Sequence, residues 1–161
     1  MISIFYIFDI SNIVISKIMT SFLDHSIGYN MNMAALILKR ELQNQFNQHR
    51  YDVTTEQWAV LNRLWENDGK TQSELALTTF KDHANITRMI DLLEKKGLVL
   101  RKDDPQDRRS KLIYLTEKGK AMQEKLVPLA QEVLHRALQG ITQEEVAFMN
   151  QLSDRIIQNL V

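Results

Sequence analysis

The stretch from Asp103 to Gly119 constrains the fold of this chain most, because it contains a polar turn next to an apolar run. The turn carries two adjacent arginines, Arg108 and Arg109, and the apolar runs on either side of it are residues 98–100 and 112–115. Short apolar runs that flank a polar turn predict a β-hairpin, here with a cationic tip. A cationic tip of this kind suits the groove of a nucleic acid.

The residues before this hairpin predict a helix with one apolar side and one basic, polar side. Over residues 82–96, the apolar positions that recur at helical spacing are Ile86, Ile90 and Leu93. The polar positions off that stripe are Asn85, Thr87 and Arg88. A helix with arginine on its polar side, followed at once by a basic hairpin, is typical of a winged helix-turn-helix.

The segment Thr71–Gly119 resembles MarR-type transcription regulators in four motifs, which occur in the family's order and at its separations. These motifs are Asn-Ile-Thr-Arg-Met-Ile-Asp at 85–91, Lys-Gly-Leu-Val at 96–99, Asp-Arg-Arg at 107–109 and Leu-Thr-Glu-Lys-Gly at 115–119. The resemblance implies a mainly α fold, namely a winged helix-turn-helix with a two-stranded β wing and long N- and C-terminal dimerisation helices. It also implies a cytoplasmic homodimer that binds a pseudo-palindromic operator in double-stranded DNA, commonly as a repressor.

The charge distribution agrees with a nucleic-acid partner, although the formal net charge of the 161-residue chain is zero. Residues 81–120 hold eleven Lys or Arg against seven Asp or Glu, and both flanks are acidic. An ordinary charged surface would explain this surplus by itself, but its coincidence with the motifs favours DNA binding. The alternative is a winged-helix protein-interaction module without DNA readout, which would be expected to lack the surplus.

We expect a single domain over residues 24–161, preceded by an apolar N-terminal arm at 1–23. Within the domain, residues 24–50 and 116–161 are the expected dimerisation helices and 54–115 the expected DNA-binding lobe. Both terminal segments have helical apolar periodicity, yet the lobe between them is too small to cover two such faces. A second copy of the chain is therefore the expected cover, and a monomer that packs these helices on its own core is the alternative.

Local motifs predict where the helices begin and end. Thr54 with Gln57, Thr71 with Glu74, and Thr142 with Glu145 have the spacing of capping boxes, and Asp82 is a candidate N-cap. After the wing at 98–115, a long helix is expected from Thr116 to Gly140. Pro128 lies inside this helix and is expected to bend it.

The apolar stretch Met1–Met19 is interrupted by Asp9, Asn12 and Lys17. No basic region precedes it and no small-residue cleavage site follows, so we expect neither a signal peptide nor a membrane-spanning segment. Two interpretations stay open. The stretch is either a start-site artefact, with Met19 as the true initiator, or a hydrophobic arm that packs across a dimer.

The helix predicted over residues 82–96 would be the recognition helix of a winged helix-turn-helix. Five residues in this helix or just before it are candidates for DNA contacts. Arg88 lies early in the helix, where its guanidinium is expected to pair with guanine O6 and N7 and to discriminate by about 1–3 kcal/mol. Thr87 suits a thymine methyl group, a base edge or a phosphate, and Asn85 is a second candidate base reader. His83 and Lys81 are better placed for phosphate.

The predicted wing adds further candidates. The resemblance implies that Arg109 enters the minor groove while Asp107 holds the wing in shape, and a narrow minor groove does attract arginine. Additional phosphate contacts are expected from Arg101, Arg108 and Lys111 of the wing, and from Gln72 and Ser73 at the start of the helix before the predicted recognition helix.

The resemblance also implies a small aromatic effector, a phenol or aromatic carboxylate, bound between the dimerisation region and the DNA-binding lobe. The candidate lining residues are Tyr29, Met33 and Trp58. Aromatic residues and methionines at helical spacing also occur as ordinary core, so both interpretations stay open.

Other functional classes lack support in the sequence. The chain has no cysteine, which excludes disulfides, thiolate metal sites and the cysteine-based peroxide sensing that some regulators of the resembled family use. Its four histidines are scattered rather than spaced as metal ligands. No catalytic motif stands out, so we expect a non-enzyme without a cofactor or bound metal.

Overall fold

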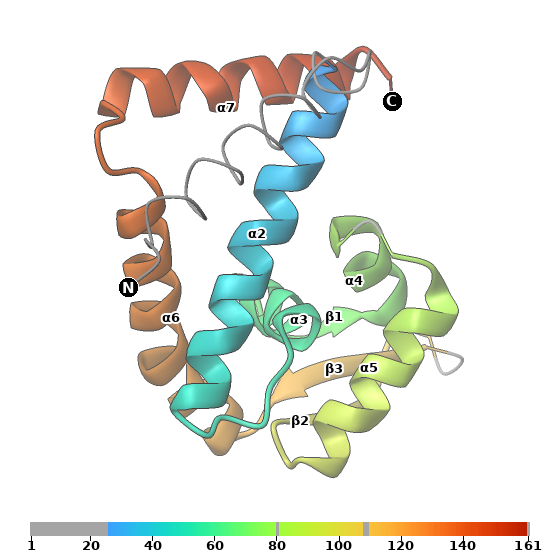
Figure 1. Ribbon diagram of the computed structural model, residues 1–161. Helices are drawn as coiled ribbons and strands as arrows, with labels where there is room; N and C mark the ends of the chain where they lie inside the picture. The colour runs from blue at the N-terminus through green and yellow to red at the C-terminus, as the bar shows by residue number, and fades with distance from the viewer. Residues whose placement is uncertain (1–25, 80, 108–109, 161) are drawn as a thin grey trace. The chain divides into compact units, whose positions relative to one another are not determined.

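The computed structural model describes residues 26–79, 81–107 and 110–160. The chain separates into two compact units, residues 1–40 and 41–161, and helix α2 (Ile27–Gln48) begins in the first and ends in the second (Figure 1). The expected N-terminal arm at 1–23 lies outside the described residues, as do Arg108 and Arg109 of the wing tip.

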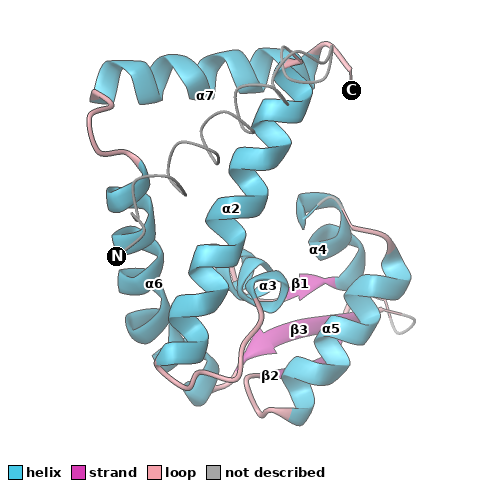
Figure 2. Cartoon of the chain, in the orientation of Figure 1, coloured by secondary structure: helices cyan, strands magenta, loops and turns pink. Residues whose placement is uncertain are grey.

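The described part of the chain is mainly helical, as predicted (Figure 2). After α2 come α3 (Thr55–Glu66), β1 (Lys70–Thr71), α4 (Gln72–Thr79), α5 (His83–Lys95), β2 (Val99–Asp103), β3 (Lys111–Leu115), α6 (Glu117–Ala137) and α7 (Gln143–Gln158). Helices α4 and α5 form the helix-turn-helix, and the β2–β3 hairpin is the wing.

The predicted helix starts are confirmed, because side chains satisfy backbone N–H groups that a helix leaves without partners. Thr54 and Thr142 each form a complete capping box, with Gln57 and Glu145 respectively. Asp82 accepts from the Asn85 N–H at 2.7 Å at the start of α5. These contacts join residues three apart, which is why the sequence reveals them.

The sheet has one strand more than predicted, since β1 pairs with β3 and gives the antiparallel order β1-β3-β2. In the predicted hairpin, Val99 lies opposite Leu115 and Asp103 opposite Lys111. Asp68, just before β1, accepts from the Leu115 N–H at 2.9 Å and so fastens the connection to the end of β3. A two-residue strand is too short to show alternation, and for that reason the sequence did not predict β1.

The core of the second unit collects the apolar sides of its helices and strands. Its fully buried side chains include Phe46, Val60, Leu61, Leu64, Leu75, Ile86, Ile90, Leu93, Ile113 and Leu126. The predicted apolar stripe of α5 is thus confirmed by the burial of Ile86, Ile90 and Leu93. Because these three side chains hold α5 by one face, its opposite face is exposed.

The base of the wing is joined closely to the start of α6. Thr116, the N-cap of α6, donates its hydroxyl to Gly97 O at 2.7 Å and its backbone N–H to Leu98 O at 3.0 Å. Gly119 approaches the same carbonyl so closely that a Cβ there would lie 2.0 Å from Leu98 O. Trp65 donates from Nε1 to Gly119 O at 3.1 Å. The Leu-Thr-Glu-Lys-Gly motif is therefore a packing requirement at this junction.

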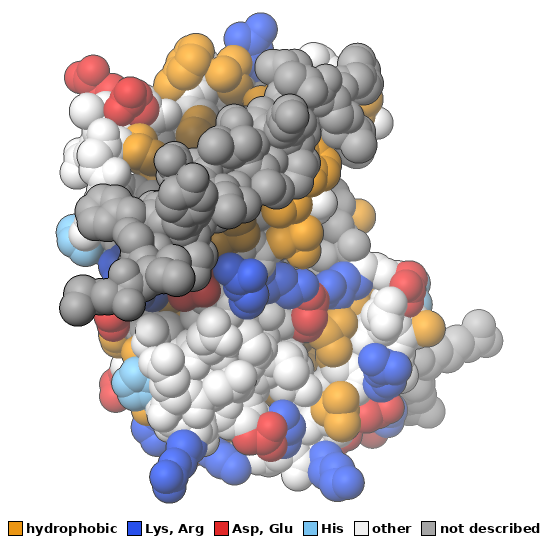
Figure 3. All heavy atoms as spheres, in the orientation of Figure 1, with side chains coloured by type: hydrophobic (Ala, Val, Ile, Leu, Met, Phe, Trp, Pro, Cys, Tyr) orange, Lys and Arg blue, Asp and Glu red, His pale blue; other side chains and the backbone are white. Residues whose placement is uncertain are grey.

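The terminal helices leave apolar side chains on the surface. Helix α7 buries none of its residues, and its exposed apolar side chains are Phe148, Met149, Leu152, Ile156 and Ile157. Figure 3 shows hydrophobic side chains over this helix. In the first unit, the exposed apolar side chains of α2 are Ile27, Tyr29, Met31, Met33, Leu36 and Ile37. Within the described ranges, no helix combines the length and hydropathy needed to cross a bilayer.

Candidate nucleic-acid interface

The exposed face of α5 begins at its first turn, where His83, Asn85, Thr87 and Arg88 are all exposed. The Arg88 side chain makes no hydrogen bond or ion pair with any described residue. A guanidinium has five N–H donors in a fixed planar arrangement, so an exposed and unpartnered one can bind an acceptor pair such as guanine O6 and N7. The structure thus places Arg88 as the sequence predicts, on a helix anchored by its opposite side.

Thr87 and Gln72, two predicted contact residues from different helices, lie against each other. The Thr87 hydroxyl oxygen is 3.2 Å from Gln72 Oε1 and 2.9 Å from His83 O. This contact connects the first residue of α4 to the exposed face of α5. The Gln72 carbonyl oxygen faces Thr87, and within the described residues its amide N–H groups make no hydrogen bond, so they can meet a phosphate.

Asn85 contributes to the start of α5 with its side chain. Its Nδ2 donates to Asp82 Oδ2 at 2.7 Å, and its backbone N–H donates to Asp82 Oδ1. The backbone hydrogen bond from Asn85 is the main cause that lowers the pKa of the Asp82 carboxyl below its ordinary value. A base contact by Asn85 would therefore use the amide oxygen and the second N–H of this side chain, or require the side chain to leave Asp82.

Arg101 has a structural role that the sequence analysis missed. Its guanidinium pairs with Asp91 at 2.6 Å and also with Glu94, both on α5. The Arg101 side chain is 21% exposed, so the ion pairs form between β2 and the outer side of the recognition helix. Arg101, which was expected to contact a phosphate, therefore connects the wing to α5.

Two other expected phosphate contacts also have carboxylate partners. Lys81, in the connection between α4 and α5, pairs with Glu56 on α3. Lys111, at the start of β3, pairs with Asp103 across the hairpin. To contact DNA, each lysine would either share its ammonium group between the carboxylate and a phosphate, which repel each other, or exchange one anion for the other.

The described part of the wing tip is a closed turn. The Ser110 N–H donates to Asp107 O at 2.9 Å, and the Gln106 N–H donates to Asp104 Oδ1 at 2.8 Å. These contacts lie on both sides of Arg108 and Arg109, which are outside the described residues. The groove contacts expected of the two arginines, and the supporting role expected of Asp107, remain predictions.

A hollow of about 480 Å³ lies between α4 and the start of α5, and sequence reasoning did not anticipate it. It is lined by Ser73, Ala76, Leu77, Lys81 and His83, three of which are expected DNA contacts. Leu77 is apolar, yet it is 77% exposed here. Helix α4 has eight residues, too few for apolar periodicity to separate its inner and outer faces.

The three expected effector-lining residues fall in different units of the chain. Tyr29 and Met33 are exposed on the part of α2 that belongs to the first unit. Trp58 belongs to the second unit, where its ring lies 6.4 Å from that of Phe46 between centroids. Its Nε1 atom is buried and has no hydrogen-bond partner among the residues that the structure describes. In the described ranges, no three His, Asp or Glu side chains are grouped to hold a metal ion.

Comparisons with known proteins agree with this geometry. The sequence profile of the MarR family matches residues 53–111, from the start of α3 into the wing. The organic hydroperoxide resistance transcriptional regulator of Bacillus subtilis (strain 168) is 32% identical over 97 residues, 59% of this chain and 66% of that protein. YybA, an uncharacterized HTH-type transcriptional regulator of the same strain, is 32% identical over 109 residues, 68% of this chain and 73% of that protein.

The fold has solved counterparts as well. The wild-type MarR of E. coli, in its apo form, superposes with a TM-score of 0.69 and is 29% identical. The match covers 81% of this chain and 96% of that one. The sequence and structure matches both extend beyond the helix-turn-helix itself, and the two curated relatives are transcription regulators rather than enzymes.

Proposed function

Since this chain belongs to the MarR family of DNA-binding transcription regulators, we propose that it represses transcription by binding a pseudo-palindromic operator as a homodimer. In this proposal α5 enters the major groove and Arg88 reads a guanine there. The wing places Arg109 in the adjacent minor groove. The observation that carries the proposal is the exposed, unpartnered guanidinium of Arg88 on a helix anchored by its opposite face.

The dimensions of α5 suit this role. Its 13 residues make a rod roughly 20 Å long, and the major groove of B-DNA is about 12 Å wide. The buried stripe of Ile86, Ile90 and Leu93 would keep the helix in place while its exposed face enters the groove. The hollow beside Leu77 would then face the DNA, where an exposed leucine can contact a thymine methyl group.

The homodimer proposal is supported by the exposed apolar side chains of the terminal helices. Phe148 and Met149 of α7 are 60% and 59% exposed, and Leu152 and Ile156 follow on the same helix. Exposed apolar groups in such number on one helix are typical of an interface. We therefore assign residues 24–50 and 116–161 to dimerisation and residues 54–115 to DNA binding.

We extend the proposal to a small-molecule effector near Trp58. Its buried Nε1–H group finds no acceptor in the described part of the chain, which is unfavourable unless another group, such as a ligand or water, supplies one. The Bacillus subtilis relative is named for organic hydroperoxide resistance. This chain has no cysteine, so a response to peroxide through a thiol does not carry over.

The decisive experiment selects bound sequences from a random pool of double-stranded DNA with the full chain. We expect enrichment of an inverted repeat whose half-site centres lie about one helical turn apart, roughly 34 Å. Failure to enrich any sequence would contradict DNA readout and favour the protein-interaction alternative. Enrichment of a site without symmetry would contradict the homodimer.

Variants then test the two arginines on the selected operator. Arg88→Ala should weaken binding by about 1–3 kcal/mol and remove the preference at one base position in each half-site. Arg109→Ala should relax a preference for A·T pairs elsewhere and lower the magnitude of the salt slope by about one. Arg63→Ala is the matched control, since Arg63 is a half-buried arginine on α3 that pairs with Glu66. An Arg88→Ala protein that behaves like this control would refute the assigned role.

A further inference from the structure

A second hollow, of about 690 Å³, lies at the other end of α5 from Arg88. It is bounded by the connection between α2 and α3, by the last turn of α5 and by the start of α6. Its floor is formed by Val53, Leu98 and Met122, which are almost fully buried, and Tyr51 and Leu92 complete the apolar lining. A hollow of this volume is the usual size for a small ligand.

Four basic side chains surround this aliphatic floor. They are Arg50, Lys95, Lys96 and Lys118, against the single carboxylate of Asp52. Figure 3 shows basic side chains along the lower margin of the molecule, over the C-terminal end of α5 and the start of α6. The excess of positive charge next to an aliphatic surface fits a ligand that carries both an acid group and an apolar body.

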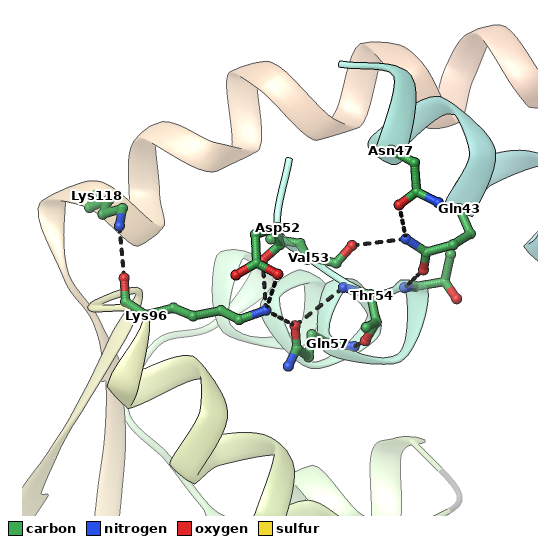
Figure 4. A network of polar contacts seen from close by, with 9 residues as sticks. Gln43, Asn47, Asp52, Val53, Thr54, Gln57, Lys96 and Lys118 are labelled. Carbon is green, nitrogen blue, oxygen red and sulfur yellow. Dashed lines mark hydrogen bonds and ion pairs between the residues drawn. The ribbon is translucent and has the colours of Figure 1, made fainter. Parts of the chain in front are cut away.

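Two of the four cations are already engaged, and two are not. Lys96 Nζ donates to Asp52 O at 2.7 Å, to Asp52 Oδ1 at 2.9 Å and to Gln57 Oε1 at 3.1 Å, while Lys118 Nζ donates to Lys96 O at 2.8 Å (Figure 4). The side chains of Arg50 and Lys95 make no hydrogen bond or ion pair with any described residue. The hollow thus combines a fixed wall at Lys96 with two unpartnered cations.

The backbone at Arg50 adds to this argument. Arg50 has a φ of 58°, in the left-handed region where helices commonly end with glycine or asparagine. An arginine at this position accepts backbone strain that those residues avoid. Replacement of Arg50 by asparagine would therefore remove the positive charge and at the same time relieve the backbone strain.

We propose that this hollow binds a small amphipathic carboxylate. Its acid group pairs with Arg50 and Lys95, and its alkyl body of roughly six to ten carbons lies on Val53, Leu98 and Met122. Four of the five apolar lining residues are not aromatic, Tyr51 being the exception, so the lining suits an alkyl chain better than a flat ring. The site lies wholly in the second unit and does not depend on the DNA-binding role.

Titration of the full chain with octanoate, without DNA, tests the proposal by calorimetry and by amide chemical shifts. We expect saturable binding, with shift changes concentrated at residues 50–53, 92–98 and 118–122. Octanol, which has the same chain without the charge, should bind at least tenfold more weakly. Equal affinity for the two probes, no saturation, or shift changes mainly elsewhere would overturn the proposal.

Two variants separate loss of the site from loss of the fold. Arg50→Asn should weaken octanoate binding at least tenfold while raising the melting temperature, because asparagine tolerates the left-handed backbone. Lys95→Gln should weaken binding without a large change in stability. Arg63→Gln, away from the hollow, should bind octanoate as the unmodified protein does. Octanoate affinity that stays unchanged in both Arg50→Asn and Lys95→Gln would show that the cations do not form the site.

Discussion

Replacement of Gly119 by alanine tests the junction between the wing and α6, and the structure gives its magnitude. The added Cβ would lie 2.0 Å from Leu98 O, whereas a carbon and a carbonyl oxygen in contact need roughly 3.3 Å. The obstacle is backbone, so it cannot rotate away as a side chain would. The start of α6 and the base of the wing would have to separate by more than 1 Å, on the order of the difference between these two distances.

Such a separation would break the hydrogen bonds that hold the junction. The Thr116 N–H and Leu98 O are 3.0 Å apart, and Trp65 Nε1 and Gly119 O are 3.1 Å apart. Each broken bond costs about 0.5–1.5 kcal/mol, and the strained contact adds about 1–3 kcal/mol. We therefore expect Gly119→Ala to lower the free energy of unfolding by about 3–5 kcal/mol.

Urea unfolding followed by far-ultraviolet circular dichroism measures this loss. Gly140→Ala is the matched control, because Gly140 has a φ of 78° but no described residue beyond its chain neighbours comes within 4 Å of the position of its Cβ. The Gly140→Ala control should lower the free energy of unfolding by about 1–2 kcal/mol, because alanine is strained in the left-handed backbone conformation. If Gly119→Ala were no more destabilised than Gly140→Ala, the steric argument for the Leu-Thr-Glu-Lys-Gly motif would be wrong.

Two further predictions concern pH and assembly. The hydrogen bond from the Asn85 N–H lowers the pKa of the Asp82 carboxyl in the folded protein. The charged carboxylate therefore stabilises the fold above the ordinary pKa of an aspartate, and this stabilisation is lost as the pH falls through the pKa of the folded state. The Asp82→Ser variant keeps a helix cap that carries no charge. Its melting temperature should therefore fall less between about pH 5 and pH 3 than that of the unmodified protein, and an equal fall in the two proteins would contradict this. Leu152→Asp should shift sedimentation equilibrium at micromolar concentration from dimer towards monomer, whereas the neighbouring exposed Gln151→Asp should not. A clean monomer from the unmodified chain would contradict the dimer itself.

The parts of the fold that the sequence predicted are those set by local contacts. Thr54, Asp82 and Thr142 bond to backbone N–H groups three residues on, and the stripe at Ile86, Ile90 and Leu93 follows from helical spacing. The same reasoning correctly placed Arg88 on the exposed side of α5. Periodicity decides which face of a long helix is buried, and the opposite face follows from it.

The parts that the sequence missed depend on tertiary neighbours. Arg101 is a basic residue of the predicted wing, and only the packing of β2 beside α5 brings Asp91 and Glu94 to it. Leu77 is apolar, yet the short α4 turns it outward. Composition and spacing identify which side chains are cationic or apolar, but the partners of those side chains come from elements distant in the sequence.

The ion pairs of Lys81, Arg101 and Lys111 affect how this chain would search a genome. Attraction to arbitrary DNA grows with the number of counterions that a protein's cations displace from the phosphates. A cation that leaves a carboxylate for a phosphate exposes the negative charge of that carboxylate, which attracts counterions itself. The net number of counterions released is therefore small. If the chain binds an operator as proposed, its zero formal net charge predicts brief residence on unrelated sequence and a search mainly by diffusion through solution.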